Sequence, residues 1–432
     1  MKRRSFVKKT MAATAGAFVA PYILPSGRLF AATGARKVDH VVFCMFAGGV
    51  RNLESVHKAD GNLMPHMFSG TESISPDIYA GVNPITASPL SQPLQKYGTL
   101  FKEFRYAYGP TGHFNGHTTA LTGVYSSNDI NIRENPKYPT VFEYYRKHNT
   151  PSMPATNAWW VSDSLGSYPL LNYSNYPGYG AAFGGNHIQP SSFIMQGYNA
   201  LANPRTFSAS EQSVIEKVRG FCDSNFAAQY QANDAGVTND PTGASQIDTF
   251  INQSFTEAAS GLYNDPWGIG GLNGDQFNIF FAEQIIKEFT PELLVVNMQG
   301  VDVCHTDFTN YCKNLNRASY ATAHLWKTIQ STPGMQDNTV MIVVPEHGRN
   351  LDPNTIMDPY GRFALDHTND DTSREIFCLV VGPPSVVKQD QVISSVTGQS
   401  IDVVPTIANV LGFDTDIPAG MLAGTPLSQA FV

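Results

Sequence analysis

The sequence has few cysteines, few charged residues and no long hydrophobic run. Its five cysteines form no Cys-x-x-Cys pair in 432 residues, so the usual ligand pattern of a zinc ribbon or an iron–sulfur cluster is absent. Charged residues make up 15% of the chain, the formal net charge is -8, and no basic run follows the N-terminal segment, which excludes an ordinary nucleic-acid surface. No later segment approaches the roughly 18 consecutive apolar residues of a membrane span. We therefore expect a folded protein without a nucleic-acid partner and without a transmembrane segment after its N-terminal region.

The N-terminal segment carries a twin-arginine pattern. Arg3 and Arg4 stand in the run Lys-Arg-Arg-Ser-Phe-Val-Lys, and a mildly apolar stretch follows at residues 11–20. That stretch is too short to span a bilayer and is rich in Ala, Thr and Gly, which argues against an amphipathic first helix. The small residues Ala-Ala-Thr-Gly directly before Ala35 suit a signal peptidase. We expect residues 1–34 to be a twin-arginine signal peptide that exports the folded protein to the periplasm or the extracellular space.

Four short apolar runs rich in β-branched residues predict buried parallel strands, because a strand covered by helices on both faces is apolar on both sides. These runs are Val41–Phe46, Leu293–Met298, Val340–Val344 and Ile376–Val381. Helical patterns lie between them: one opens with a capping box at Ser208 and Glu211, one covers Phe277–Phe289, and one follows His305. The alternation predicts an α/β fold for residues 35–432, a three-layer α/β/α sandwich around a mostly parallel sheet.

The composition changes between Ser164 and Asn203, where Tyr, Asn, Gly and Pro dominate. No regular element fits this stretch well. It is typical of an ordered surface loop, although a long ordered loop beside a site can also serve as its lid. We expect an insertion or cap at about 160–275.

Carboxylates and imidazoles follow two of the predicted strands. Asp302 and His305 come after the second strand, and Glu346 and His347 come directly after the third. Ligands bind beyond the carboxyl ends of strands in an open α/β sheet, so these side chains are expected to meet at one edge. Carboxylate oxygens and neutral imidazoles are ligands of zinc and manganese, and His367, from the loop before the last strand, is a further candidate. The pattern predicts one or two divalent metal ions.

This arrangement resembles the alkaline phosphatase superfamily, which includes sulfatases, nucleotide pyrophosphatases and cofactor-independent phosphoglycerate mutases. The run Val380–Pro383 with Ile401–Ile407 is similar to the closing strand and helix of that family, and Thr119–Tyr125 is similar to the turn that follows its nucleophile. The resemblance implies that one metal ion is held by Asp302, His305 and His367. It implies a second ion near Glu346 and His347.

The sequence departs from the family pattern at the second metal position. Counting back from the turn, the nucleophile position falls on His113, the sulfatase signature Cys-x-Pro-Ser-Arg is absent, Gly48 stands where the first strand should end in an Asp, and Glu346 replaces an Asp. Two interpretations remain open. In one, His113, or His117 one helical turn on, is a metal ligand or a nitrogen nucleophile. In the other, this half of the site has been lost.

Other residues near these positions are weaker candidates. Thr111, Thr118 and Thr119 have hydroxyl groups that could replace the nucleophile, or they serve only in capping and packing. Arg51 follows the Gly48-Gly49 turn and Arg349 follows His347, so each is placed to face an anionic group or to be an ordinary surface arginine.

Together these features predict an exported metal-dependent hydrolase of a phosphate or sulfate ester, with catalytic candidates His113, His117 and Arg51. The expected substrate is a small molecule or a glycan ester. The alternative is a catalytically degenerate member that serves as a binding or assembly protein. A metal-dependent oxidoreductase ranks last, since no redox ligand set is present.

Overall fold

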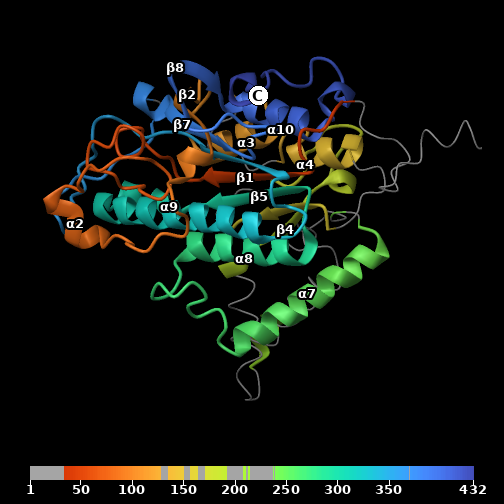
Figure 1. The fold of residues 1–432 in the computed structure, drawn as a ribbon, viewed down its shortest axis with the longest axis horizontal. Coiled ribbons are helices and arrows are strands. Elements are labelled where there is room, and N and C mark those ends of the chain that lie inside the picture. The colour runs from red at the N-terminus through yellow and green to blue at the C-terminus, as the bar shows by residue number, and fades with distance from the viewer. Residues whose placement is uncertain are drawn as a thin grey trace, which may run out of the picture.

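The computed structural model describes residues 34–127, 135–149, 156–163, 171–191, 208–210, 213–214, 237, 239–368 and 370–432. Within them, an eight-stranded sheet has the order β4-β3-β5-β1-β6-β7-β2-β8. The strands are β1 (His40–Phe46), β2 (Gly98–Arg105), β3 (Ala158–Val161), β4 (Asn186–Ile188), β5 (Leu293–Met298), β6 (Thr339–Pro345), β7 (Glu375–Val381) and β8 (Gln391–Gln399). Helices lie on both sides of this sheet (Figure 1). The predicted three-layer α/β fold with a mostly parallel sheet is confirmed.

The predicted direction of one strand, β7, is wrong. β1 pairs in parallel with both β5 and β6, as expected, but β7 runs antiparallel to β6 and to β2. A parallel return needs a crossover that carries the chain back along the sheet, usually a helix. The described residues between 346 and 374 form one short helical element, the 3-10 helix Asp371–Arg374, so the chain re-enters the sheet at the edge where it left. The loop that contains His367 therefore stays at the carboxyl ends of β1, β5 and β6.

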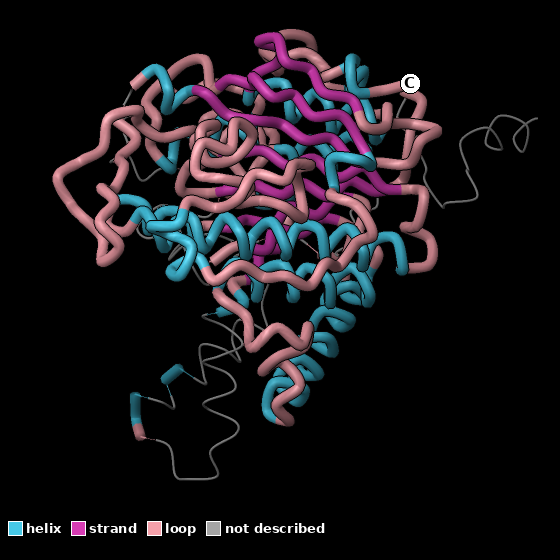
Figure 2. The backbone as a smooth tube through the Cα atoms, turned by 60° about the vertical axis from the view of Figure 1, so that its left-hand side comes forward, coloured by secondary structure: helices cyan, strands magenta, loops and turns pink. Residues whose placement is uncertain are grey.

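Alternate side chains of the central strand enter two different cores. Val42, Cys44 and Phe46 of β1 belong to the core that also contains residues of two long helices, α8 (Gly274–Phe289) and α9 (Phe308–Ser331). The intervening side chains face the opposite core, formed with α3 (His113–Thr122), α4 (Val141–Tyr144) and α10 (Val403–Leu411). Figure 2 shows the strands of the sheet in magenta behind the cyan helices of one layer. This alternation, with a period of two residues, fixes the two faces of the sheet.

The two predicted helices that flank β5 are present. α8 begins three residues before the predicted start, because Asn273 and Gln276 form a capping box: the Asn273 side chain accepts from the Gln276 amide at 2.9 Å and the Gln276 side chain accepts from the Asn273 amide at 3.0 Å. α9 is the helix expected after His305. Cys304 and Cys312, whose spacing left a disulfide open, are buried free thiols.

The region from about 160 to 275 is described only in part. α7 (Pro241–Ala259) projects from the body of the molecule in both ribbon views (Figures 1 and 2). The described part of the Tyr-rich stretch includes two short elements that we did not expect, the 3-10 helix Ala181–Phe183 and β4, which pairs with β3. Most of the predicted helix that opens at Ser208 and Glu211 lies outside the described residues, as do residues 1–33 of the predicted signal peptide. A cap in this region remains a prediction.

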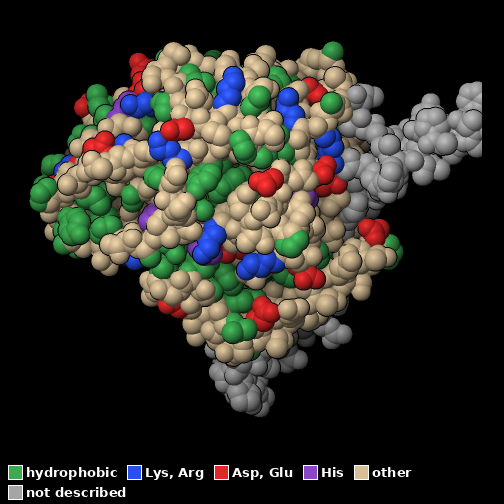
Figure 3. Space-filling model, viewed as in Figure 1, with side chains coloured by type: hydrophobic (Ala, Val, Ile, Leu, Met, Phe, Trp, Pro, Cys, Tyr) green, Lys and Arg blue, Asp and Glu red, His purple; other side chains and the backbone are tan. Residues whose placement is uncertain are grey.

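Two surface properties agree with the composition. On the face seen in Figure 3, Lys and Arg side chains are interspersed with Asp and Glu, and no broad patch of one sign is visible. Among the described helices, none combines the length and the apolar character that crossing a membrane requires.

Candidate metal centre

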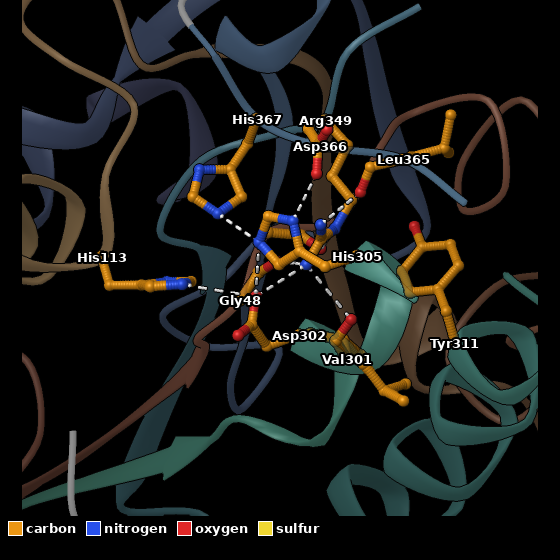
Figure 4. Close-up of polar contacts among 12 residues, drawn as sticks. Gly48, His113, Val301, Asp302, His305, Tyr311, Arg349, Leu365, Asp366 and His367 are labelled. Carbon is orange, nitrogen blue, oxygen red and sulfur yellow. Dashed lines mark hydrogen bonds and ion pairs between the residues drawn. The ribbon is translucent and has the colours of Figure 1, made fainter. Parts of the chain in front are cut away.

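Four segments bring ionisable side chains to the carboxyl edge of the central strands, and the turn after β1 adds a backbone amide. The end of β5 leads into a 3-10 helix, Gly300–His305, which carries Asp302 and His305. The end of β6 leads directly to Glu346 and His347, and the following loop supplies His367. α3 begins at His113, and the turn after β1 completes the site. Figure 4 shows His113, Asp302, His305 and His367 close together at this edge.

The first group of potential metal ligands consists of His113, Asp302, His305 and His367. One ligand atom from each lies within 4.8 Å of the others. Asp302 Oδ1 is 3.2 Å from His305 Nε2 and 3.3 Å from His113 Nε2, and His305 Nε2 is 2.9 Å from His367 Nε2. Four nitrogen and oxygen donors at these separations suit one small divalent cation.

The hydrogen bonds of His305 and His367 assign their protons. His305 Nδ1 lies 2.6 Å from Asp366 Oδ1, and His367 Nδ1 lies 2.5 Å from the carbonyl oxygen of Thr111, so each Nδ1 carries a proton and donates it. The two Nε2 atoms face each other at 2.9 Å, and His305 Nε2 also lies 3.2 Å from Asp302 Oδ1. These three atoms are of the types that ligate a divalent cation. A carboxylate or carbonyl behind an imidazole is also the usual support of a metal-ligating histidine.

The second group consists of His113, Glu346 and His347, and it is more deeply buried. Glu346 Oε1 lies 2.7 Å from His113 Nδ1 and 3.2 Å from His347 Nε2. His347 Nδ1 is 2.8 Å from the Gly348 carbonyl oxygen and donates to it, which leaves Nε2 as a lone-pair nitrogen facing a carboxylate. His347 Nε2 and Glu346 Oε2 are buried and make no hydrogen bond, although Nε2 faces Glu346 Oε1 and Oε2 contacts His117 Nδ1. A buried carboxylate beside imidazole nitrogens offers the donor types that a divalent cation binds.

His117 lies behind this second group and belongs to neither. It is fully buried, and its Nδ1 contacts Glu346 Oε2 but donates to the carbonyl oxygen of His113 at 2.8 Å. Its other nitrogen lies 3.2 Å from Asn297 Oδ1. The structure therefore brings together His113, Glu346 and His347 and places His117 as a support for the carboxylate.

Close packing after β1 explains why position 48 is a glycine and not an Asp. Gly48 has φ +105°, and a Cβ atom added there would lie 2.6 Å from both the backbone nitrogen and the Cβ of Asp302. No larger residue fits while Asp302 keeps its place. The Gly48 amide donates instead to Glu346 Oε1. A backbone donor to Glu346 thus occupies the position where the family resemblance implied a carboxylate.

Both candidate arginines are engaged inside the protein. Arg51 pairs with the buried Glu54, with Nε 2.9 Å from Oε2, and donates to the carbonyl oxygens of Asn350 and Leu351. Arg349 is fully buried and donates to the carbonyl oxygen of Leu365 at 2.8 Å and to Asp302 Oδ1 at 3.0 Å. The guanidinium of Arg51 holds the loop after β6, and a role of Arg51 toward an anion stays a prediction.

One candidate threonine has a structural contact, and the other two are buried in a helix. The Thr111 hydroxyl donates to the His367 carbonyl oxygen at 2.9 Å, while its own carbonyl receives the His367 proton, so the two residues hold each other. Thr118 and Thr119 are buried within α3. None of the three hydroxyl groups is placed as a nucleophile.

The charges around the two groups set the protonation states. Burial would raise the pKa of Asp302, but its contacts with His113, His305 and Arg349 hold that pKa well below the ordinary value. Burial would likewise raise the pKa of Glu346, and the surrounding imidazoles hold it low. Burial lowers the pKa of His367. His113 differs, because burial would lower its pKa whereas Glu346 and Asp302 raise it to about 10.

Sequence reasoning missed Asp366, whose carboxylate orients His305. The residue stands directly before His367, but only the folded loop shows which imidazole it contacts.

No protein-family model matches the chain, and no curated protein is significantly similar to it in sequence. Solved structures are similar in fold. A variant of the alkaline phosphatase PafA is 10% identical, with 93% of this chain and 100% of that chain covered and a TM-score of 0.47. The lipoteichoic acid synthase LtaP from Listeria monocytogenes is 12% identical, with 90% and 75% covered and a TM-score of 0.43. A 2-O GAG sulfatase is 12% identical, with 90% and 73% covered and a TM-score of 0.44. At these values the likeness is one of fold alone.

Proposed function

We propose that this chain is a metal-dependent hydrolase of a phosphate or sulfate ester. The observation that carries the proposal is the convergence of His305 Nε2 and His367 Nε2, 2.9 Å apart, on the ionised Asp302. Each ring is oriented from behind, because its Nδ1 donates to Asp366 or to the backbone of Thr111. This is the usual support of a metal-ligating histidine.

The residues that would hold metal are those of the two groups. Asp302, His305 and His367 would hold one ion, zinc or manganese by ligand type, and Glu346 and His347 would hold a second, with His113 beside both. A divalent ion bound there would polarise the ester oxygen and stabilise the charge that develops in the transition state.

Solvent exposure indicates the side from which a substrate enters. The side chain of Asp302 is 40% exposed, whereas those of Glu346 and His347 are fully buried. An ester would therefore approach over the first group. Since the Thr111 hydroxyl donates to the His367 carbonyl oxygen and Thr118 and Thr119 are buried within α3, water is the nucleophile that we favour.

Charge explains why such an enzyme would depend on metal. The two arginines nearest the site, Arg51 and Arg349, are engaged by Glu54, by backbone carbonyls and by Asp302. The negative charges of Asp302 and Glu346 are offset within the site by His113, whose pKa is raised to about 10, and by Arg349. Bound cations would add the positive charge that attracts an anionic ester.

The twin-arginine pattern supports export of the folded chain to the periplasm or the extracellular space. Ligands as distant in sequence as His113 and His367 meet only after folding. Folding before export would therefore let the metal bind inside the cell, before the protein is exported. A small molecule or a glycan ester is the substrate class that we propose.

Hydrolysis of aryl phosphate and aryl sulfate by the metal-free full chain, before and after addition of zinc or manganese, tests the proposal. We expect turnover of one ester class that appears with metal and is lost in Asp302→Ala. His57→Ala is the matched control, because His57 also pairs with a carboxylate, Glu103, at 2.7 Å but lies outside the site. A chain that binds metal but turns over neither ester would instead favour a binding or assembly protein.

A further inference from the structure

We infer that His113 bridges two metal ions, with Nδ1 on the ion held by Glu346 and His347 and Nε2 on the ion held by Asp302, His305 and His367. The inference rests on the proposed metal centre and adds the number of ions, their connection and the role of His113. Within the described residues, His113 is the one side chain shared by both ligand groups.

The two ring nitrogens of His113 face carboxylates of different groups. Nδ1 lies 2.7 Å from Glu346 Oε1, and Nε2 lies 3.3 Å from Asp302 Oδ1. The ring thus separates the fully buried carboxylate from the solvent-exposed one. Figure 4 shows the edge of the ring directed at Asp302.

The contrast with the other three histidines shows that this placement is particular to His113. His305, His347 and His367 each direct Nδ1 to an oxygen that is not in either ligand group: the carboxylate of Asp366 or a backbone carbonyl. Each therefore has one nitrogen left for a metal. His113 directs both ring nitrogens at ligand carboxylates, so it has one nitrogen for each ion.

The local backbone holds the ring in this position. His113 is the first residue of α3, and its carbonyl oxygen accepts from His117 Nδ1 at 2.8 Å. α3 packs closely on Glu346, since a Cβ atom added at Gly116 would lie 2.9 Å from the Glu346 Cβ. The glycine permits the approach that brings His113 Nδ1 to the buried carboxylate.

A bridging imidazole has lost both of its ring protons. The first ion would displace one proton of His113 and the second ion the other, each released to solvent, and two adjacent cations stabilise the resulting anionic ring. Both nitrogens are then occupied, so His113 cannot attack phosphorus or sulfur. Water becomes the nucleophile, and no phosphorylated histidine forms.

Cobalt(II) titration of the metal-free full chain tests the bridge without measuring activity. We expect two cobalt ions per chain, release of one proton with the second ion, and an electron paramagnetic resonance signal weakened by coupling between the ions. In His113→Ala, both ions should bind more weakly and the coupling should disappear, while His57→Ala should behave as the unchanged protein. The proton count requires no variant, so it stands even if His113→Ala does not fold.

The outcomes separate this inference from the proposed function. One cobalt ion per chain, or two ions without coupling and without proton release, would overturn the bridge while leaving a metal-dependent hydrolase intact. A covalent phosphoryl group on His113 after incubation with ester would also overturn it. Failure to bind any cobalt would contradict the proposed function as well.

Discussion

Replacement of Gly48 by alanine is predicted to destabilise the protein through a backbone collision at the metal centre. Gly48 has φ +105°, and its added Cβ would lie 2.6 Å from the backbone nitrogen and from the Cβ of Asp302. The obstructing atoms belong to the backbone or lie next to it, so rotation of a side chain cannot relieve the contact. Either the turn after β1 or the helix that carries Asp302 must move.

The expected loss of unfolding free energy in Gly48→Ala has two parts. A non-glycine residue in the left-handed region costs about 1–2 kcal/mol. Forcing an extra methyl group into a packed site adds about 1–3 kcal/mol. Gly334→Ala is the matched control, because Gly334 has φ +87° and nothing within 4 Å of its added Cβ. The control should lose only the free energy that the left-handed conformation costs.

Urea unfolding in the presence of a chelator measures the difference without a contribution from bound metal. We expect Gly48→Ala to lose about 1–3 kcal/mol more unfolding free energy than Gly334→Ala, and to bind zinc more weakly because Asp302 is displaced. Equal losses in the two variants would refute the close packing of Gly48 against Asp302.

Three further predictions concern other side chains. Asp366→Asn should weaken zinc binding by about 10–100-fold in a chelator competition while the fold is retained, because the anion behind His305 is lost; unchanged affinity would contradict the assigned proton. Arg51→Met should lower the unfolding free energy by about 3–5 kcal/mol, since it leaves Glu54 buried without its partner, and should leave the metal content unchanged; a loss of metal without loss of stability would contradict this placement. Burial raises the pKa of Asp275 to about 6 from 3.8, so the folded state binds its proton more tightly and stability should fall as the pH rises from about 4 to 6. Asp275→Asn should remove about 2–3 kcal/mol of that decline in pH-dependent urea unfolding, and an unchanged slope would contradict the raised pKa.

The central strands were predictable because their sequences are apolar on both faces. β1, β5, β6 and β7 all lie where the hydrophobic runs placed them. The direction of β7 was not predictable from its residues, since it depends on whether a crossover precedes it. The four remaining strands were missed for physical reasons: β3 and β4 have only four and three residues, β2 is interrupted by a bulge, and β8 is a largely exposed edge strand.

Part of the candidate site was predictable because strand ends converge. The sequence placed Asp302, His305, Glu346 and His347 at one edge, and the structure brings them there with His113 and His367. Supporting contacts were not predictable, since the partner of an imidazole is decided by loop geometry. The roles of Arg51 and Arg349 also needed the folded loops, because an arginine after a strand can equally face a ligand or a carbonyl.

The central claim is that these side chains bind metal, and elemental analysis of the full chain purified from a host that exports it tests that claim most directly. The account predicts bound zinc or manganese, two ions per chain if His113 bridges them, and loss of metal in Asp302→Ala but not in His57→Ala. A chain without bound metal that also takes up none on reconstitution, or a metal content that Asp302→Ala leaves unchanged, would contradict it.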